Sequence, residues 1–210
     1  MYVTPKPLEP TEIIGGCIAV YKNAWSNPLE TIKILERVTS NKDFPVPFTP
    51  AQTLGEEARG VSTQSIRTNY NLALHDAGRH NDELREINNK FFELCLGSSI
   101  WYSQHFGFDP HVYINEVFQV LRYSGGQHYE AHFDGSTETG RCISPILYLN
   151  SDYTGGEIEF VNYNIKIKPE SGMFLLFPAS FPYRHIAHPV ETGTKYAIVT
   201  WLHDRPSGAY

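Results

Sequence analysis

Hydrophobic residues follow two different periods along the chain, and the change falls near residue 114. Upstream, apolar residues in 82–97 recur at close to 3.6-residue spacing, which predicts a helix that the pattern allows to reach 106. The stretch 27–40 predicts a second, amphipathic helix with Pro28 in its first turn. Residues 14–23, IGGCIAVYKN, are typical of a strand.

Downstream of residue 114, short β-like segments alternate with turns rich in Gly, Asn, Pro and Ser. Eight such segments are INEVFQVLRY, HYEAHFD, CISPILYLN, GEIEFV, NIKIKP, GMFLLFP, HIAHPV and KYAIVTWL. This spacing predicts a sandwich or barrel, and eight strands fit a jelly roll with a small-molecule site in its mouth. We therefore expect an α+β fold in a single domain, 1–210, with a double-stranded β-helix (jelly-roll) core at 114–205. Residues 1–110 would supply supporting strands and helices.

One long loop interrupts the supporting half. Residues 41–60, NKDFPVPFTPAQTLGEEARG, are rich in proline and polar residues and lack a helical or strand period. Long loops in compact domains are often functional, so this segment is a candidate lid over the substrate.

Composition narrows the classes of protein. The chain has 210 residues, a net charge of −6 and no basic run, which argues against a nucleic-acid partner. No apolar run approaches the length of a membrane span, and the first residues, MYVTPKPLEPTEII, lack the pattern of a secretory signal. The three cysteines are widely spaced and odd in number, which indicates free thiols in a reducing compartment. We expect a cytoplasmic protein without a membrane partner.

The triplet His-x-Asp occurs twice, in settings that differ. In YEAHFDG, 129–135, a strand would turn His132 and Asp134 to the same face, where an imidazole and a carboxylate could bind one metal. His80 and Asp82 stand at the start of the predicted helix, with Asn81 or Asp82 as its N-cap. Positions i and i+2 point apart on a helix, so this second triplet is a helix start.

A third metal ligand is expected in the last quarter of the chain. His185 and His188 are three residues apart, so on a strand they face opposite ways and at most one can join His132 and Asp134. Two histidines and one carboxylate form the facial triad of non-haem Fe(II) oxygenases. His128 and Glu130 remain a rival ligand pair, because they share the parity of His132.

Lys195 opens a strand whose alternate residues are Ala197, Val199 and Trp201. If Trp201 faces the barrel interior, so does Lys195. A buried lysine is costly unless it is paired with an anion, and no acidic residue shares its strand face. The carboxylate of a ligand would supply the partner.

The stretch 121–201 resembles the prolyl 4-hydroxylase branch of the 2-oxoglutarate- and Fe(II)-dependent dioxygenases. YSGGQHYEAHFD resembles the family's approach to its His-x-Asp, and GRCISPILYLN followed by GGEIEF resembles the strand pair after it. HIAHPVETGTKYAIVTW resembles the distal block, in which a histidine is followed four residues later by proline and ten residues later by a basic residue. His185, Pro189 and Lys195 match that spacing, and His188 does not.

The resemblance implies a role for each matching residue. The implied iron ligands are His132, Asp134 and His185; the implied 2-oxoglutarate-binding residues are Lys195, Tyr148 and Tyr123; the implied substrate-binding residues are Arg141 and Trp201. Some relatives have arginine at the position of Lys195. Lysine makes a point-charge contact where arginine makes a bidentate one, so Tyr148 should matter more here.

The activity implied is that of a procollagen-proline 4-dioxygenase-like enzyme. It would use Fe(II), 2-oxoglutarate and O₂, with ascorbate as reductant, to hydroxylate a prolyl residue of a peptide or protein. A hydroxylase of a free amino acid or other small molecule is not separated from this by sequence. A non-catalytic metal-binding jelly roll is the third alternative, but such a module has no need for an internal lysine.

Overall fold

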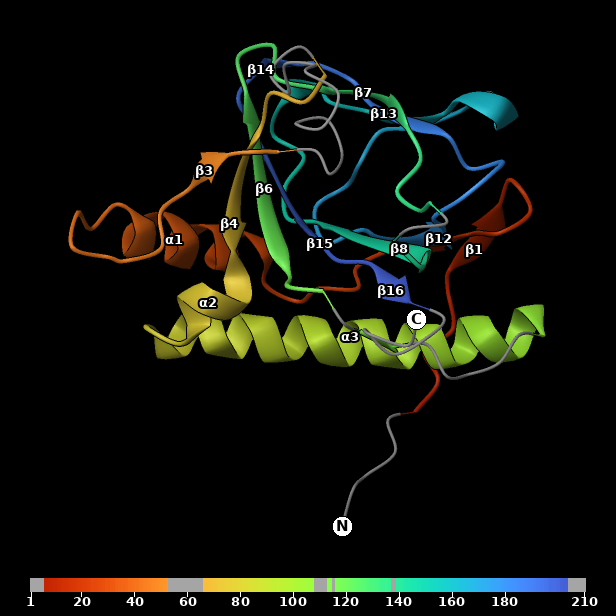
Figure 1. Cartoon of the computed structure of the whole chain (residues 1–210), viewed down its shortest axis with the longest axis horizontal. Coiled ribbons are helices and arrows are strands. Elements are labelled where there is room, and N and C mark those ends of the chain that lie inside the picture. The colour runs from red at the N-terminus through yellow and green to blue at the C-terminus, as the bar shows by residue number, and fades with distance from the viewer. Residues whose placement is uncertain (1–5, 53–65, 108–112, 115, 137–138, 204–210) are drawn as a thin grey trace.

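The computed structural model describes residues 6–52, 66–107, 113–114, 116–136 and 139–203. In this part of the chain a large antiparallel sheet faces a smaller one, and the helices lie on the side of the large sheet away from the small one (Figure 1). The expected α+β fold with a jelly-roll core is confirmed.

The strands fall into three sheets. The large sheet has the order β1 (Glu12–Ile14), β2 (Ile18–Tyr21), β12 (Phe174–Pro178), β8 (Arg141–Tyr148), β15 (Thr194–Val199), β6 (Gln119–Ser124), β4 (Tyr70–Ala73) and β3 (Thr49–Pro50), with β16 (Leu202–His203) pairing with β8 and with β5 (Tyr113–Ile114). The small sheet has the order β11 (Ile165–Ile167), β10 (Ile158–Phe160), β13 (His185–Ala187) and β7 (Tyr129–His132). The third sheet pairs β9 (Thr154–Gly155) with β14 (Val190–Thr192). A short 3₁₀ helix (Val161–Tyr163) follows β10.

The two predicted helices are confirmed. α1 spans Pro28–Thr39 with proline in its first turn, and α3 spans Asp82–Phe106. The Asn81 side chain accepts a hydrogen bond from the backbone N–H of Leu84, so Asn81 is the N-cap that the sequence left open between two residues. α3 runs along the large sheet, and the short α2 (Leu74–Gly78) connects β4 to it (Figure 1).

The central strands of the large sheet, such as β12 and β15, are buried on both faces, which explains their continuous hydrophobic runs. In β12, Phe174 and Leu176 pack toward the helices, while Leu175 and Phe177 pack between the two sheets. β15 alternates in the same way, because Ile198 joins the helix-side core and Ala197 the inter-sheet core. A sheet covered on both faces has no reason to alternate polar and apolar residues.

The predicted downstream segments all contain strands, and three of them are divided between two strands. INEVFQVLRY is divided between β5 and β6, HIAHPV between β13 and β14, and KYAIVTWL between β15 and β16. Upstream, the stretch 14–23 contains the strand β2, but it is not one continuous strand, because a turn between β1 and β2 occupies its first residues. Gly15 and Gly16 have φ values of +53° and +81° there, a left-handed backbone that interrupts an extended strand and that glycine tolerates best.

The candidate lid is only partly described. Residues 41–52 contain β3 at the edge of the large sheet, and 53–65 lie outside the described residues. The role of 41–60 as a lid therefore stays a prediction. Within the part of the chain that the structure describes, no helix has the length and apolar character needed to cross a bilayer.

Candidate metal and co-substrate site

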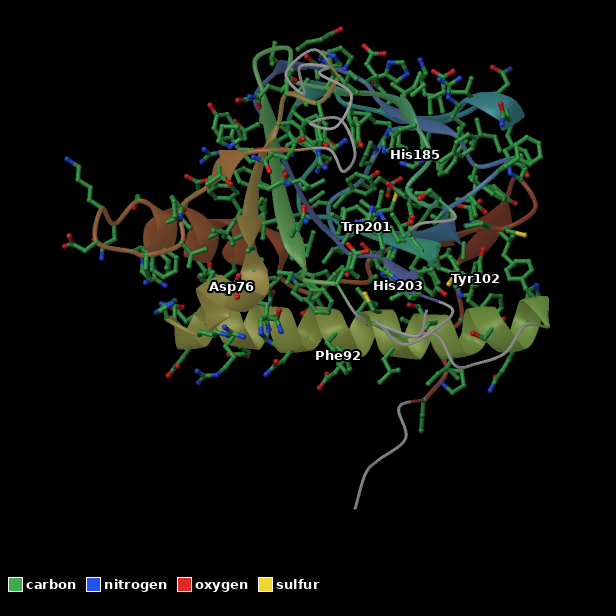
Figure 2. All side chains as sticks on the ribbon, viewed as in Figure 1. Asp76, Phe92, Tyr102, His185, Trp201 and His203 are labelled. Atoms are coloured by element: carbon green, nitrogen blue, oxygen red, sulfur yellow. The ribbon has the colours of Figure 1, made fainter. Side chains whose placement is uncertain are left out.

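The small sheet brings the two histidines of the expected triad together. His132 ends β7, His185 begins β13, and the two are direct partners in the antiparallel register. Asp134 follows β7 by two residues, and one potential ligand atom from each of the three lies within 4.8 Å of those of the others. Figure 2 shows His185 on the small-sheet side of the interior and Trp201 on the large-sheet side. Both line one cavity between the sheets.

Backbone carbonyls orient both imidazoles. Nδ1 of His132 lies 2.7 Å from the carbonyl oxygen of Glu130, and Nδ1 of His185 lies 3.1 Å from that of Tyr183. A carbonyl oxygen can only accept, so each Nδ1 carries the proton and donates. Each Nε2 is left with a free lone pair. These atoms lie 3.4 Å and 3.6 Å from the two carboxylate oxygens of Asp134.

Asp134 is held as a carboxylate by its neighbours. Burial raises the pKa of its carboxyl, but His185, His132 and the hydroxyl of Ser144 favour the charged form, and the pKa lies well below its usual range. The Ser144 hydroxyl donates to Oδ2 over 2.6 Å. An anionic carboxylate beside two imidazole lone pairs is the donor set that suits a divalent transition metal with open positions.

His185 has the protonation state that a metal ligand needs. Burial, with repulsion by His132 adding to it and Asp134 opposing it, lowers its pKa to about 4. The imidazole is therefore neutral near pH 7, which metal binding requires.

The alternative histidines are placed elsewhere. His188 points away from the cavity and lies 2.7 Å from Oε2 of Glu159. His128 and Glu130 are 3.4 Å from each other, and neither lines the cavity. His80 precedes the N-cap of α3, as expected for a helix start.

Lys195 is buried with 3% of its surface exposed, and it lines the cavity together with Ala197, Val199 and Trp201. The shared face expected for this strand is therefore present. The Nζ atom donates to the carbonyl of Gly156 over 2.7 Å and lies 5.1–5.4 Å from the rings of Tyr148 and Tyr123. Burial, with repulsion by Lys168 adding to it and Glu157 opposing it, lowers the pKa of Lys195 to about 7. Among the described residues no carboxylate lies within ion-pair distance of it, which leaves the place of a ligand carboxylate open.

Tyr148 and Tyr123 line the same cavity. Burial raises the pKa of each phenol, so both remain protonated and able to donate a hydrogen bond. Tyr148 extends from β8 and Tyr123 from β6, the two strands beside β15. They flank Lys195 as expected for partners in binding one carboxylate.

Arg141 and Trp201 lie where the cavity meets an open groove. The guanidinium stacks over the Trp201 indole at 3.7 Å and makes two 2.5 Å contacts with the carboxylate of Glu116. It also donates to the backbone carbonyl of Asp134 over 3.2 Å. Both side chains line the groove, which continues past Phe133 to the edge strand β3. A residue in this place can contact a substrate and also hold the Asp134 backbone.

Three cavity residues escaped sequence analysis. Ser144 shares a strand face with Tyr148 four positions on, so its parity could have revealed it. Tyr129 stacks on His132 with ring centroids 3.5 Å apart, and Arg67 lies over the Tyr129 ring at 4.8 Å. Arg67 is brought to the site by an isolated β-bridge to Tyr129, which is distant in sequence, so no local sequence pattern predicts its position.

Comparison with known proteins gives a match over the C-terminal part of the chain. Residues 118–203 match the model of the 2OG-Fe(II) oxygenase superfamily. The matched segment contains His132, Asp134, His185 and Lys195.

Curated relatives similar to this part of the chain carry prolyl 4-hydroxylase names. A putative prolyl 4-hydroxylase of Acanthamoeba polyphaga mimivirus is 30% identical over 110 residues, which cover 43% of this chain and 46% of the relative. Probable prolyl 4-hydroxylase 9 of Arabidopsis thaliana is 31% identical over 119 residues, covering 43% and 41% respectively. The matched part thus spans less than half the length of these relatives.

Solved structures support the fold. A Trichoplax adhaerens prolyl hydroxylase in complex with a hypoxia inducible factor peptide aligns with a TM-score of 0.69 and 23% identity, over 90% of this chain and 84% of the other. A Pseudomonas putida prolyl-4-hydroxylase aligns with a TM-score of 0.58 and 16% identity, over 90% and 94%. The superfamily implies Fe(II), 2-oxoglutarate and O₂ as cofactor and co-substrates.

Proposed function

We propose that this protein is a 2-oxoglutarate- and Fe(II)-dependent dioxygenase that hydroxylates prolyl residues in a peptide or protein. The observation that carries the proposal is that three metal-ligand side chains and a buried lysine converge on one cavity, and that none of the described residues gives this lysine a carboxylate partner. The prolyl 4-hydroxylase names of the relatives support the choice of substrate.

Three of the cavity residues would bind the metal. His132, Asp134 and His185 would hold Fe(II) through the two Nε2 atoms and a carboxylate oxygen, with both histidines fixed through Nδ1. When bound, the iron activates O₂ at positions that three protein ligands leave open.

Lys195 would pair with the far carboxylate of 2-oxoglutarate, and the hydroxyl of Tyr148 would donate to the same group. Tyr123, whose ring lies 5.4 Å from the Lys195 Nζ atom, would flank the same carboxylate. The apolar walls, among them Ala197 and Val199, exclude water from the reacting atoms. In the overall reaction one atom of O₂ enters the substrate C–H bond and the other enters succinate, while CO₂ leaves.

Arg141 and Trp201 would contact the peptide at the mouth of the cavity. Ascorbate would serve as a reductant that keeps the iron in its ferrous state. All three cysteines are free thiols, which supports a reducing, cytoplasmic location.

A turnover screen tests the proposal. The protein would be incubated with Fe(II), 2-oxoglutarate, O₂ and proline-containing peptides, and succinate would be measured together with a peptide mass gain of one oxygen atom. We expect coupled formation of both products, and neither with Asp134→Ala. Oxidation of free L-proline but of no peptide would contradict the macromolecular substrate. Metal binding without succinate formation would favour the non-catalytic module.

A further inference from the structure

Two basic side chains other than histidine are buried among the described residues, and both face the cavity. Lys195 is 3% exposed and Arg67 is 6% exposed. The proposed function gives Lys195 the far carboxylate of 2-oxoglutarate. It assigns no anion to Arg67, and none of the described residues supplies one.

Arg141, which lines the groove, differs from Arg67 in this respect. Its guanidinium is neutralised by Glu116 at 2.5 Å. No carboxylate of a described residue lies within ion-pair distance of Arg67, and the oxygens that accept its hydrogen bonds are neutral. A buried charge is costly unless an opposite charge accompanies it, so the environment of Arg67 is complete only with a ligand anion.

The guanidinium is nonetheless held firmly in place. Nε donates to Oδ1 of Asn69 over 2.9 Å, and the two terminal nitrogens make longer contacts of 3.4 Å to the Gln52 carbonyl and to Oδ1 of Asn71. Asn71 is in turn anchored by its amide donating to Gln119 over 2.9 Å. A guanidinium has five N–H donors, so these three contacts leave further N–H groups of Arg67 able to donate to a ligand.

The position of Arg67 places that ligand beside the reacting centre. Arg67 lines both the inner cavity and the open groove that continues toward β3. Its guanidinium carbon lies 4.8 Å from the Tyr129 ring, whose centroid is 3.5 Å from that of His132. At about 3.3 Å per extended residue, a group on Arg67 lies within roughly three residues of a substrate proline at the metal.

We propose that Arg67 binds a carboxylate of the substrate, so that the enzyme prefers peptides with a carboxylate within three residues of the hydroxylated proline. This inference rests on the proposed prolyl hydroxylase function. A guanidinium fork matches a carboxylate in geometry as well as charge. The carboxylate can come from an Asp or Glu side chain or from the C-terminus of the peptide.

Matched peptides test the preference with the unaltered protein. Each peptide has blocked ends and contains one proline. The two members of a pair differ only in having Asp or the neutral Asn at one of the three positions before or after that proline. A second pair ends shortly after the proline in a free acid or an amide. We expect kcat/KM to favour the charged member at one position or at the terminus by on the order of ten- to hundredfold, the range of a hydrogen bond to a charged group. Which pair responds identifies the source of the carboxylate.

Variants assign the preference to Arg67. Arg67→Gln should abolish the charged-over-neutral ratio while the neutral peptide is still hydroxylated, and Arg67→Lys should keep part of the ratio. Arg85→Gln, which alters an exposed arginine paired with Asp82, is the matched control and should keep all of it. The KM for 2-oxoglutarate should stay unchanged in Arg67→Gln.

The contrary results separate the two proposals. Hydroxylation of charged and neutral peptides at equal kcat/KM would overturn the role of Arg67 and leave the prolyl hydroxylase function standing. A ratio that persists in Arg67→Gln, or a variant whose main effect is a raised KM for 2-oxoglutarate, would also overturn it. If no peptide is hydroxylated at all, the proposed function and this inference both fail.

Discussion

His132 and His185 are direct cross-strand partners in the small sheet, and their ring centroids lie 4.3 Å apart. The relationship depends on the register between β7 and β13, because a slip of one residue would turn a side chain to the opposite face. It also separates His185 from His188, which lies 2.7 Å from Glu159 outside the cavity.

Removing any one of His132, Asp134 or His185 should abolish metal binding at this site. Each Ala variant leaves two protein ligands, so we expect loss of Fe(II)-dependent succinate formation and of Mn²⁺ binding measured by titration. His188→Ala is the control and should retain most of both activities, as should His80→Ala. Loss of turnover in His188→Ala with retention in His185→Ala would show that the distal ligand is misassigned.

Replacing Lys195 should weaken 2-oxoglutarate binding more than replacing Tyr148. Lys195→Met leaves the far carboxylate unpaired in a buried site, a cost of about 3–5 kcal/mol. Tyr148→Phe removes one hydrogen bond to a charged group, at about 1–3 kcal/mol. The measurement is the KM for 2-oxoglutarate at saturating iron. Lys166→Met, which alters a half-exposed lysine near Glu159, is the control. An unchanged KM in Lys195→Met would exclude the carboxylate role.

The unliganded protein should become more stable as pH rises above about 7. Burial lowers the pKa of Lys195 to about 7 in the folded protein, against about 10.4 in an unfolded chain. Between these values the unfolded chain binds a proton that the folded protein does not, so the free energy of unfolding increases with pH. Lys195→Met should lack this increase between pH 7 and 9.5 in denaturant titrations.

The same titration should affect co-substrate binding in the opposite direction. Only the ammonium form of Lys195 attracts a carboxylate, so 2-oxoglutarate affinity should fall as pH rises through about 7 in the absence of substrate. Calorimetric titration under anaerobic conditions with Mn²⁺ would measure it. A flat profile in the wild-type protein would contradict the contact, whereas a flat profile in Lys195→Met is expected.

Local periodicity was sufficient to predict the features that depend on one strand or helix. The shared face of Lys195 and Trp201 follows from alternation along β15, and the N-terminus of α3 follows from the cap at Asn81. The resemblance to a known family then supplied the choice of His185 over His188, which alternation alone left open.

Relationships across strands could not be predicted in this way. Ser144, on β8 of the large sheet, meets Asp134, which follows β7 of the small sheet, and Arg67 meets Tyr129 through a bridge between segments far apart in sequence. The turn at Gly15 and Gly16 was missed because the apolar residues on either side continue one another's pattern. Register and crossing depend on the whole fold.

Loss of the Ser144 hydroxyl should weaken metal binding without removing a ligand. Ser144 donates to Oδ2 of Asp134 over 2.6 Å, which fixes the carboxylate and favours its charged form. Groups that orient metal ligands typically contribute 10- to 100-fold in affinity, so we expect Ser144→Ala to raise the dissociation constant for Mn²⁺ by about that factor.

Ser98→Ala is the matched control for this experiment. It removes another buried serine hydroxyl, one that donates to the Leu94 carbonyl within α3, away from the cavity. Both variants should unfold at similar denaturant concentrations when no metal is present, and only Ser144→Ala should bind Mn²⁺ more weakly. Equal affinities in the two variants would mean that the strands alone position Asp134, because the hydrogen bond would then add nothing to the orientation of the carboxylate.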